Sequence, residues 1–184
     1  KYFSGHADAM LGFVISDKKY GAAIKTTAIR FGTCAGPDVC YMGLRGLRTL
    51  GVRLPRHYES GLKLAEWLAT RPEVDKVLHP SMAQCPGHEF WKRDFLGASG
   101  LFGVILQPAS DTAVAAMIDD LQLFGLGDSW GGYESLLVPS NPKNNRTVTD
   151  WPYAGPCLRI HAGLEDVDDL IDDLGDGLDR LTRV

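Results

Sequence analysis

Residues 100–107 have the sequence GLFGVILQ, and this stretch indicates the fold most clearly. It is a nearly continuous apolar run of strand length, which predicts a strand buried on both faces. A second strand is expected at residues 157–163, CLRIHAG, where the leucine and isoleucine face one way and Arg159 and His161 face the other. The two runs predict a sheet in the second half of the chain.

Helical patterns surround these strands. Residues 45–70 carry apolar side chains on one face and predict a long helix, which Pro55 should kink or restart. A shorter helix with a Ser110 or Asp111 cap is expected after the first strand. The segment at 164–181, LEDVDDLIDDLGDGLDRL, predicts a final amphipathic helix. Its acidic residues crowd the start, as the helix dipole favours, and are expected to form a solvated face.

These elements predict an α/β fold in two parts. Residues 61–184 give the order helix, strand, strand, helix, strand, helix, which is an α/β unit of domain size. Residues 1–60 predict a different piece, with a strand at 9–16, a loop at 32–40 and the start of the long helix. We therefore expect the boundary inside the long helix, near residue 60.

Composition excludes several classes of protein. The hydrophobic fraction of 45% is enough for a normal core, and the net charge of −4 argues against nucleic acid or an anionic membrane as partner. No apolar run is long enough to span a membrane. The four cysteines form no C-x-x-C pair, so no metal site is expected. Reduced, structural thiols would fit a cytoplasmic protein.

Three places carry candidate chemistry. Arg159 on its strand is a rigid fork for a carboxylate, although a solvated arginine on an exposed face would give the same pattern. Residues 128–135, DSWGGYES, combine Ser129, Trp130 and two glycines, which suit a ligand pocket or a strand with a glycine bulge. Lys1 becomes a covalent catalyst only if its amine is desolvated or lies beside another cation.

A resemblance distinguishes between these alternatives. The segment KYFSGHADAMLG resembles the lysine segment of the pyridoxal-phosphate enzymes of cysteine and methionine metabolism, with Gly-His following a lysine and an aromatic residue. LRGLRTLGVRL, GHEFWKRDFLGASGLFGV, SWGGYESL and LRIHAGLEDVDDLI resemble further segments of that family, in the same order. Within it the chain is most similar to the members that catalyse β-elimination of L-cystathionine, since synthase and γ-lyase relatives more often carry Leu in place of Trp130.

The resemblance implies a fold, a cofactor and a set of site residues. The fold would be the C-terminal half of a fold-type I (aspartate-aminotransferase-like) enzyme: the end of the large domain at 1–60, and a small α/β domain with a mostly antiparallel sheet at 61–184. Lys1 matches the lysine that holds pyridoxal 5′-phosphate and moves the Cα proton. Arg159 matches the residue that binds the substrate α-carboxylate, and Ser129 and Trp130 match the loop beside it.

The implied reaction is α,β-elimination of L-cystathionine to homocysteine, pyruvate and ammonia, as in methionine biosynthesis. The implied partners are a small sulfur amino acid, the N-terminal half of the same enzyme with the rest of the cofactor site, and further copies in a homotetramer. A cysteine-S-conjugate β-lyase, a cystathionine γ-lyase or γ-synthase, and a methionine γ-lyase are alternatives on this scaffold. A non-catalytic α/β binding domain is the alternative of another class.

Overall fold

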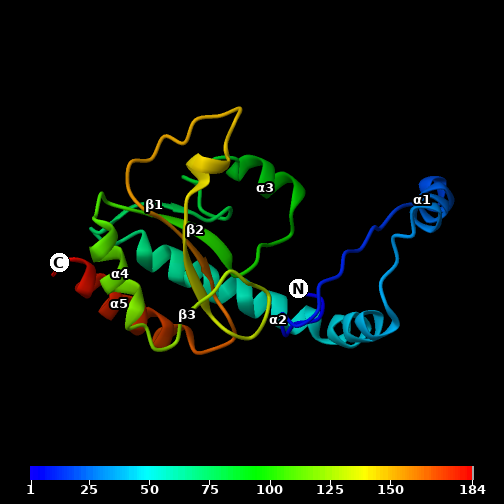
Figure 1. Cartoon of the computed structure of the whole chain (residues 1–184), viewed down its shortest axis with the longest axis horizontal. Coiled ribbons are helices and arrows are strands. Elements are labelled where there is room, and N and C mark those ends of the chain that lie inside the picture. Colours follow the sequence, from blue (N-terminus) through cyan, green and yellow to red (C-terminus); the bar gives the residue numbers. More distant parts are fainter. Residues whose placement is uncertain (184) are drawn as a thin grey trace.

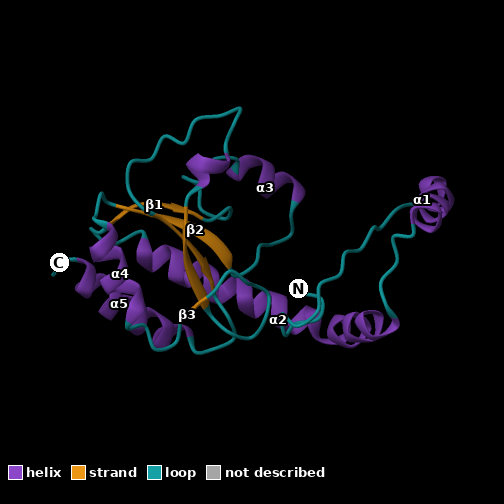
Figure 2. Cartoon of the chain, in the orientation of Figure 1, coloured by secondary structure: helices purple, strands orange, loops and turns teal. Residues whose placement is uncertain are grey.

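A computed structural model describes residues 1–183. Five strands form one sheet in the order β1-β2-β5-β4-β3 (Figures 1 and 2). All neighbouring strands are antiparallel except β3 and β4, which are parallel. This confirms the expected α/β fold with a mostly antiparallel sheet. The elements are α1 (Lys18–Phe31), α2 (Pro37–Leu68), β1 (Val74–Leu78), α3 (His88–Asp94), β2 (Leu101–Leu106), α4 (Asp111–Asp119), β3 (Gly125–Leu126), β4 (Leu136–Ser140), the 3-10 helix η1 (Pro142–Asn145), β5 (Cys157–His161) and α5 (Val167–Leu181).

The core lies between the sheet and the helices α2, α4 and α5. β5 is the central strand, with β2 on one side and β4 on the other, so its backbone is hydrogen-bonded along both edges. α4 and α5 pack against each other, and α2 packs on α5, β1 and β2. The largest fully buried apolar side chains come from these elements: Leu64, Leu68, Ile105, Leu106, Met117, Leu137, Leu158, Ile160, Leu170, Leu174 and Leu178.

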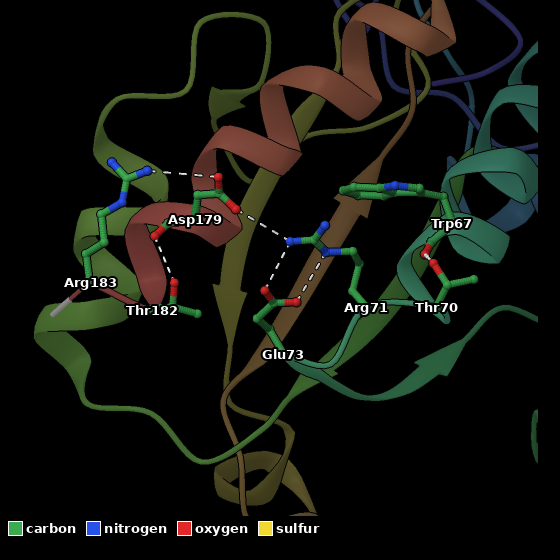
Figure 3. Close-up of polar contacts among 7 residues, drawn as sticks. All are labelled: Trp67, Thr70, Arg71, Glu73, Asp179, Thr182 and Arg183. Atoms are coloured by element: carbon green, nitrogen blue, oxygen red, sulfur yellow. Dashed lines mark hydrogen bonds and ion pairs between the residues drawn. The ribbon is translucent and has the colours of Figure 1, made fainter.

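Polar contacts fix the ends of the helices around this core. Figure 3 shows Arg71, just after α2, donating to both carboxylate oxygens of Glu73, at 3.0 and 3.2 Å. The same guanidinium lies 3.5 Å from Asp179 of α5 and 5.6 Å from the centre of the Trp67 ring. In the middle of α5, Asp173 accepts hydrogen bonds from three successive backbone amides, at 122–124. The helices are thereby joined to the loops beside the sheet.

Several local expectations hold and others are wrong. Residues 9–16 form no strand, and most of their side chains are exposed, because no other strand of the described chain pairs with them. The expected loop at 32–40 ends early, since α2 begins at Pro37, a residue whose fixed φ suits the first turn of a helix. α2 then runs through Pro55 without a break. Of the two proposed caps of α4, Ser110 is the one that accepts the amide hydrogen of Ala113.

α1 and the segments on either side of it are set apart from the rest of the chain. α1 extends away from the sheet and its helices (Figure 1), and none of its residues is buried. Apolar side chains are exposed along this part of the chain and the start of α2: Met10, Phe13, Val14, Ile15, Tyr20, Ile24, Ile29, Phe31, Tyr41, Leu44, Leu47 and Val52. A group of large exposed apolar side chains in one part of the chain marks a place where another protein segment packs.

Candidate active site

Lys1 begins a tight turn that α2 holds in place. The Gly5 amide and the Ser4 hydroxyl both donate to the Lys1 carbonyl, at 2.9 and 3.0 Å. Arg53 of α2 donates to the Tyr2 carbonyl at 2.8 Å. Gly5 has φ +83°, and a Cβ atom there would lie 2.5 Å from the Arg53 guanidinium carbon, so a side chain would strain the backbone and push away the guanidinium that holds the turn. The turn fixes the point from which the Lys1 side chain extends.

The loop at 128–135, between β3 and β4, lies directly against this turn. Gly131 has φ +78°, and a Cβ atom on it would lie 2.8 Å from the Tyr2 nitrogen and 3.1 Å from Lys1 Cβ. The Gly131 N–H is not free for a ligand, because it donates to His161 Nε2 at 2.8 Å. The glycine instead allows the loop to approach the lysine turn.

The structure brings together the four residues predicted for the site. Lys1 Nζ donates to Ser129 Oγ at 2.7 Å and lies 5.1 Å from the centre of the Trp130 ring. The Arg159 guanidinium carbon lies 5.6 Å from the centre of the same ring. An indole that meets two cations is a favourable cation–π arrangement. Residues more than 150 positions apart in the sequence therefore share one aromatic neighbour, while their roles stay predictions.

Arg159 projects from the middle of β5, where it is paired with Gly103 of β2 and Val138 of β4. Its side chain is 29% exposed, so the guanidinium is neither fully solvated nor fully buried. Nη2 lies 2.6 Å from an oxygen of Asp128, a side chain that is 84% exposed. The angles are poor for a hydrogen bond, so within residues 1–183 Nη2 has this ion pair but no hydrogen-bond partner. The site thus holds a positioned guanidinium that a better-aligned carboxylate can bind.

Glu165 and Asp173 have roles that the sequence interpretation missed. Glu165 accepts hydrogen bonds from the backbone N–H and the hydroxyl of Ser135, at 2.7 and 2.8 Å, and the hydroxyl accepts from the Gly163 amide at 2.8 Å. This network closes the end of the 128–135 loop. The expectation of a solvated acidic face is therefore wrong for these two carboxylates, which anchor loops. Their helical spacing gave no indication of partners so distant in sequence.

The side chains present fit a cofactor bound through Lys1. Among the described residues, the Lys1 amine has a hydroxyl partner and no carboxylate within ion-pair distance. An amine that no counter-ion holds in its charged form is available for covalent bonds to aldehydes. Lys1 would therefore hold pyridoxal phosphate, with Trp130 beside it. Residues 1–183 contain no cluster of three His, Cys, Asp or Glu side chains suited to a metal.

Comparison with known proteins agrees with this arrangement. The model of the family described as Cys/Met metabolism PLP-dependent enzyme matches residues 1–179. This chain belongs to that family. The family's dependence on pyridoxal phosphate confirms the cofactor expected from the sequence. Cystathionine beta-lyases of Escherichia coli and Salmonella typhimurium are 44% and 43% identical to 98% of the chain, and each match covers 47% of the relative.

Solved structures with a similar fold are of cystathionine gamma synthase. Two crystal structures of cystathionine gamma synthase from Xanthomonas oryzae, one with aminoacrylate and cysteine and one with cystathionine, superpose with TM-scores of 0.83 and 0.85. They are 31% and 32% identical to this chain, and the match covers all of it and 49% of each of them. The chain therefore spans about half the length of the relatives it matches.

Proposed function

We propose that this chain is the C-terminal half of a pyridoxal-phosphate-dependent carbon–sulfur lyase. Its reaction would be the α,β-elimination of L-cystathionine, in which cystathionine and water give homocysteine, pyruvate and ammonia. The observation that carries the proposal is the shared position of the Lys1 amine and the Arg159 guanidinium, each within 6 Å of the Trp130 ring centre. The high identity to cystathionine beta-lyases supports this reaction among those of the family.

Each side chain has a definite task in this proposal. Arg159 binds the α-carboxylate and, because β5 is hydrogen-bonded on both edges, holds the Cα–H bond in a fixed direction. Lys1 takes the Cα proton on its Nζ, and Ser129 Oγ, at 2.7 Å, orients that amine. Trp130 covers the site against water. Pyridoxal phosphate, when bound, supplies an electron sink that stabilises charge at Cα, so that the Cβ–S bond can break and release a thiolate.

The exposed apolar surface around α1 supports the proposed partners. We propose that the N-terminal half of the enzyme and neighbouring copies in a homotetramer cover it, because a dozen large apolar side chains there are exposed. Burial supports the proposed division near residue 60, since the continuous core contains residues from position 64 onward. None of the helices within residues 1–183 combines the length and the apolar character needed to cross a bilayer. A cytoplasmic location is proposed because all four cysteines are free thiols.

Covalent labelling of the full-length enzyme tests the role of Lys1. Borohydride reduction should fix one pyridoxyl group on Lys1, identified by peptide mass spectrometry. Lys63 provides a matched control, because its amine is engaged with Asp168. The Lys1→Ala variant should lose both the label and the turnover of L-cystathionine, while Lys63→Ala should keep them. A label on another lysine would refute the assignment.

Product analysis decides between the related reactions. With L-cystathionine, pyruvate and homocysteine indicate β-elimination, whereas 2-oxobutyrate and cysteine indicate γ-elimination. A γ-synthase remains the second candidate because the superposed crystal structures are of that enzyme. It would form cystathionine from cysteine and an activated homoserine ester. A full-length preparation with neither cofactor absorbance nor any of these products would favour the non-catalytic binding domain.

A further inference from the structure

His161, at the end of β5, is a buried histidine whose two ring nitrogens are both used by one loop. The residue is 1% exposed. Its Nε2 accepts the hydrogen of the Gly131 amide at 2.8 Å, and its Nδ1 lies 3.0 Å from the Glu134 carbonyl oxygen. An amide can only donate and a carbonyl can only accept, so the ring must be neutral with its proton on Nδ1. The imidazole therefore links Gly131 to Glu134 within the loop at 128–135.

The bonded part of the loop is the part that faces Lys1. Gly131 directly follows Ser129 and Trp130, the residues that meet the Lys1 amine. The other end of the loop is fixed separately by Glu165. The His161 bond to Gly131 thus ties the backbone next to Ser129 and Trp130 to β5.

The same imidazole also packs behind the lysine turn. Its ring centre lies 5.8 Å from that of Tyr2, the residue after Lys1, and 5.3 Å from that of His57 of α2. The charged form of His161 is disfavoured by burial, then by His57 and by Arg159 two residues earlier on β5, which together lower its pKa to about 4. The neutral ring that the loop needs is accordingly the form present at neutral pH.

We propose that His161 is a positioning residue for the elimination reaction: it holds the Ser129–Trp130 segment at the distance from the Lys1 amine that proton transfer requires. The inference rests on the proposed function of Lys1. It assigns no bond between His161 and the substrate. Because Arg159 stands on β5 itself, loss of the His161 bonds should disturb proton transfer at Lys1 far more than binding of the carboxylate.

Three substitutions in the full-length holoenzyme separate the two bonds of the ring. His161→Gln keeps an acceptor that can reach the Gly131 amide. His161→Asn places an amide near the Glu134 carbonyl but falls short of Gly131, and His161→Leu removes both bonds. We expect kcat to fall about 10- to 100-fold in the Asn and Leu variants, with KM changed less than about threefold, and to recover to within about fivefold of wild type in His161→Gln.

His79 gives a matched control, since it is also fully buried and its Nδ1 accepts a backbone amide, that of Ser81, at 3.2 Å. Its neighbours contain none of the proposed site residues, so His79→Leu should leave kcat within about twofold of wild type. Equal kcat values for His161→Gln and His161→Asn, or a large rise in KM at unchanged kcat, would overturn the proposal.

Hydrogen–deuterium exchange of the 128–135 peptide provides a readout independent of turnover. Exchange should accelerate at least tenfold in His161→Asn and His161→Leu and stay near the wild-type rate in His161→Gln. Unchanged exchange in the Asn variant contradicts the positioning role. If the Leu variant does not fold, the comparison of Gln with Asn decides alone. Absence of lyase activity in the wild-type protein would instead contradict the proposed function, whatever the exchange rates are.

Discussion

Asp128→Asn tests whether the Arg159 guanidinium binds the substrate carboxylate. In the structure an Asp128 oxygen lies 2.6 Å from Arg159 Nη2, so the substrate must displace a carboxylate that already occupies the guanidinium. Because Asp128 is 84% exposed and the contact is poorly aligned, the pair contributes as a surface ion pair, about 0.2–1 kcal/mol. Removing the Asp128 charge should therefore lower KM by the factor that corresponds to this free energy, roughly 1.4 to 5.

Asp128→Asn should change KM and leave kcat as it is. The value of kcat should not change, since Asp128 has already left Arg159 when the substrate is bound. Steady-state kinetics with L-cystathionine and with an L-cysteine S-conjugate should give the same factor, because both substrates share the α-carboxylate. Asp94→Asn is the matched control: Asp94 forms a 2.7 Å surface pair with Arg93, away from the proposed site. That variant should keep the wild-type KM.

Two results would contradict the reasoning. An unchanged or increased KM for both substrates would mean that Asp128 does not compete with the carboxylate. An increase for L-cystathionine alone would mean that Asp128 contacts the distal half of that substrate instead.

Further variants test the site and the surrounding fold. Arg159→Ala should raise KM strongly in steady-state assays, because the bound carboxylate loses its partner. The decrease in kcat/KM should correspond to about 2–4 kcal/mol of lost transition-state stabilisation. An unchanged KM would exclude carboxylate binding. Gly46→Ala places a Cβ atom 1.9 Å from the Phe3 carbonyl oxygen. Urea denaturation should therefore show a decrease of about 1–3 kcal/mol in the free energy of unfolding. An unchanged free energy of unfolding would mean that the lysine turn does not pack on α2. Below pH 6.5 the unfolded chain binds a proton at His161, while the folded chain does so only near its pKa of about 4. Stability should therefore fall as the pH is lowered from 6.5 to 4, by up to about 3 kcal/mol, and His161→Gln should show a smaller fall in urea titrations at pH 7 and pH 5. His57, whose pKa is also lowered mainly by burial, adds a fall of the same sign in both proteins.

Local patterns were sufficient for the elements that form the centre of the fold. The apolar run at 100–107 contains β2, and the alternating segment at 157–163 contains β5. Both strands have a neighbour on each side in the sheet, so burial requires apolar residues there and the sequence pattern shows it. β3 has only two residues and β4 contains Pro139, so neither carries a strand pattern. The apolar segment at 9–16 was misassigned because its side chains have no partner strand within the described residues.

The candidate site followed from the resemblance and not from local pattern. Local pattern alone did not distinguish a carboxylate-binding Arg159 from a solvated arginine, or a catalytic Lys1 from an ordinary lysine, because the residues that surround them are distant in sequence. The contact of Asp128 with Arg159 and the two bonds of His161 depend on the path of a glycine-containing loop over the sheet. No spacing in the sequence encodes that path, so these contacts required the three-dimensional structure.

One strand serves both the interior and the chemistry of this protein. The odd-numbered positions of β5 present Arg159 and His161 to the site, while Leu158 and Ile160, on its other face, are among the most deeply buried residues. A change of volume beneath the strand will therefore tilt the groups above it, even though it touches neither substrate nor cofactor. Libraries that vary these two interior positions to gain thermal tolerance will alter turnover as well, and should be screened for rate together with yield.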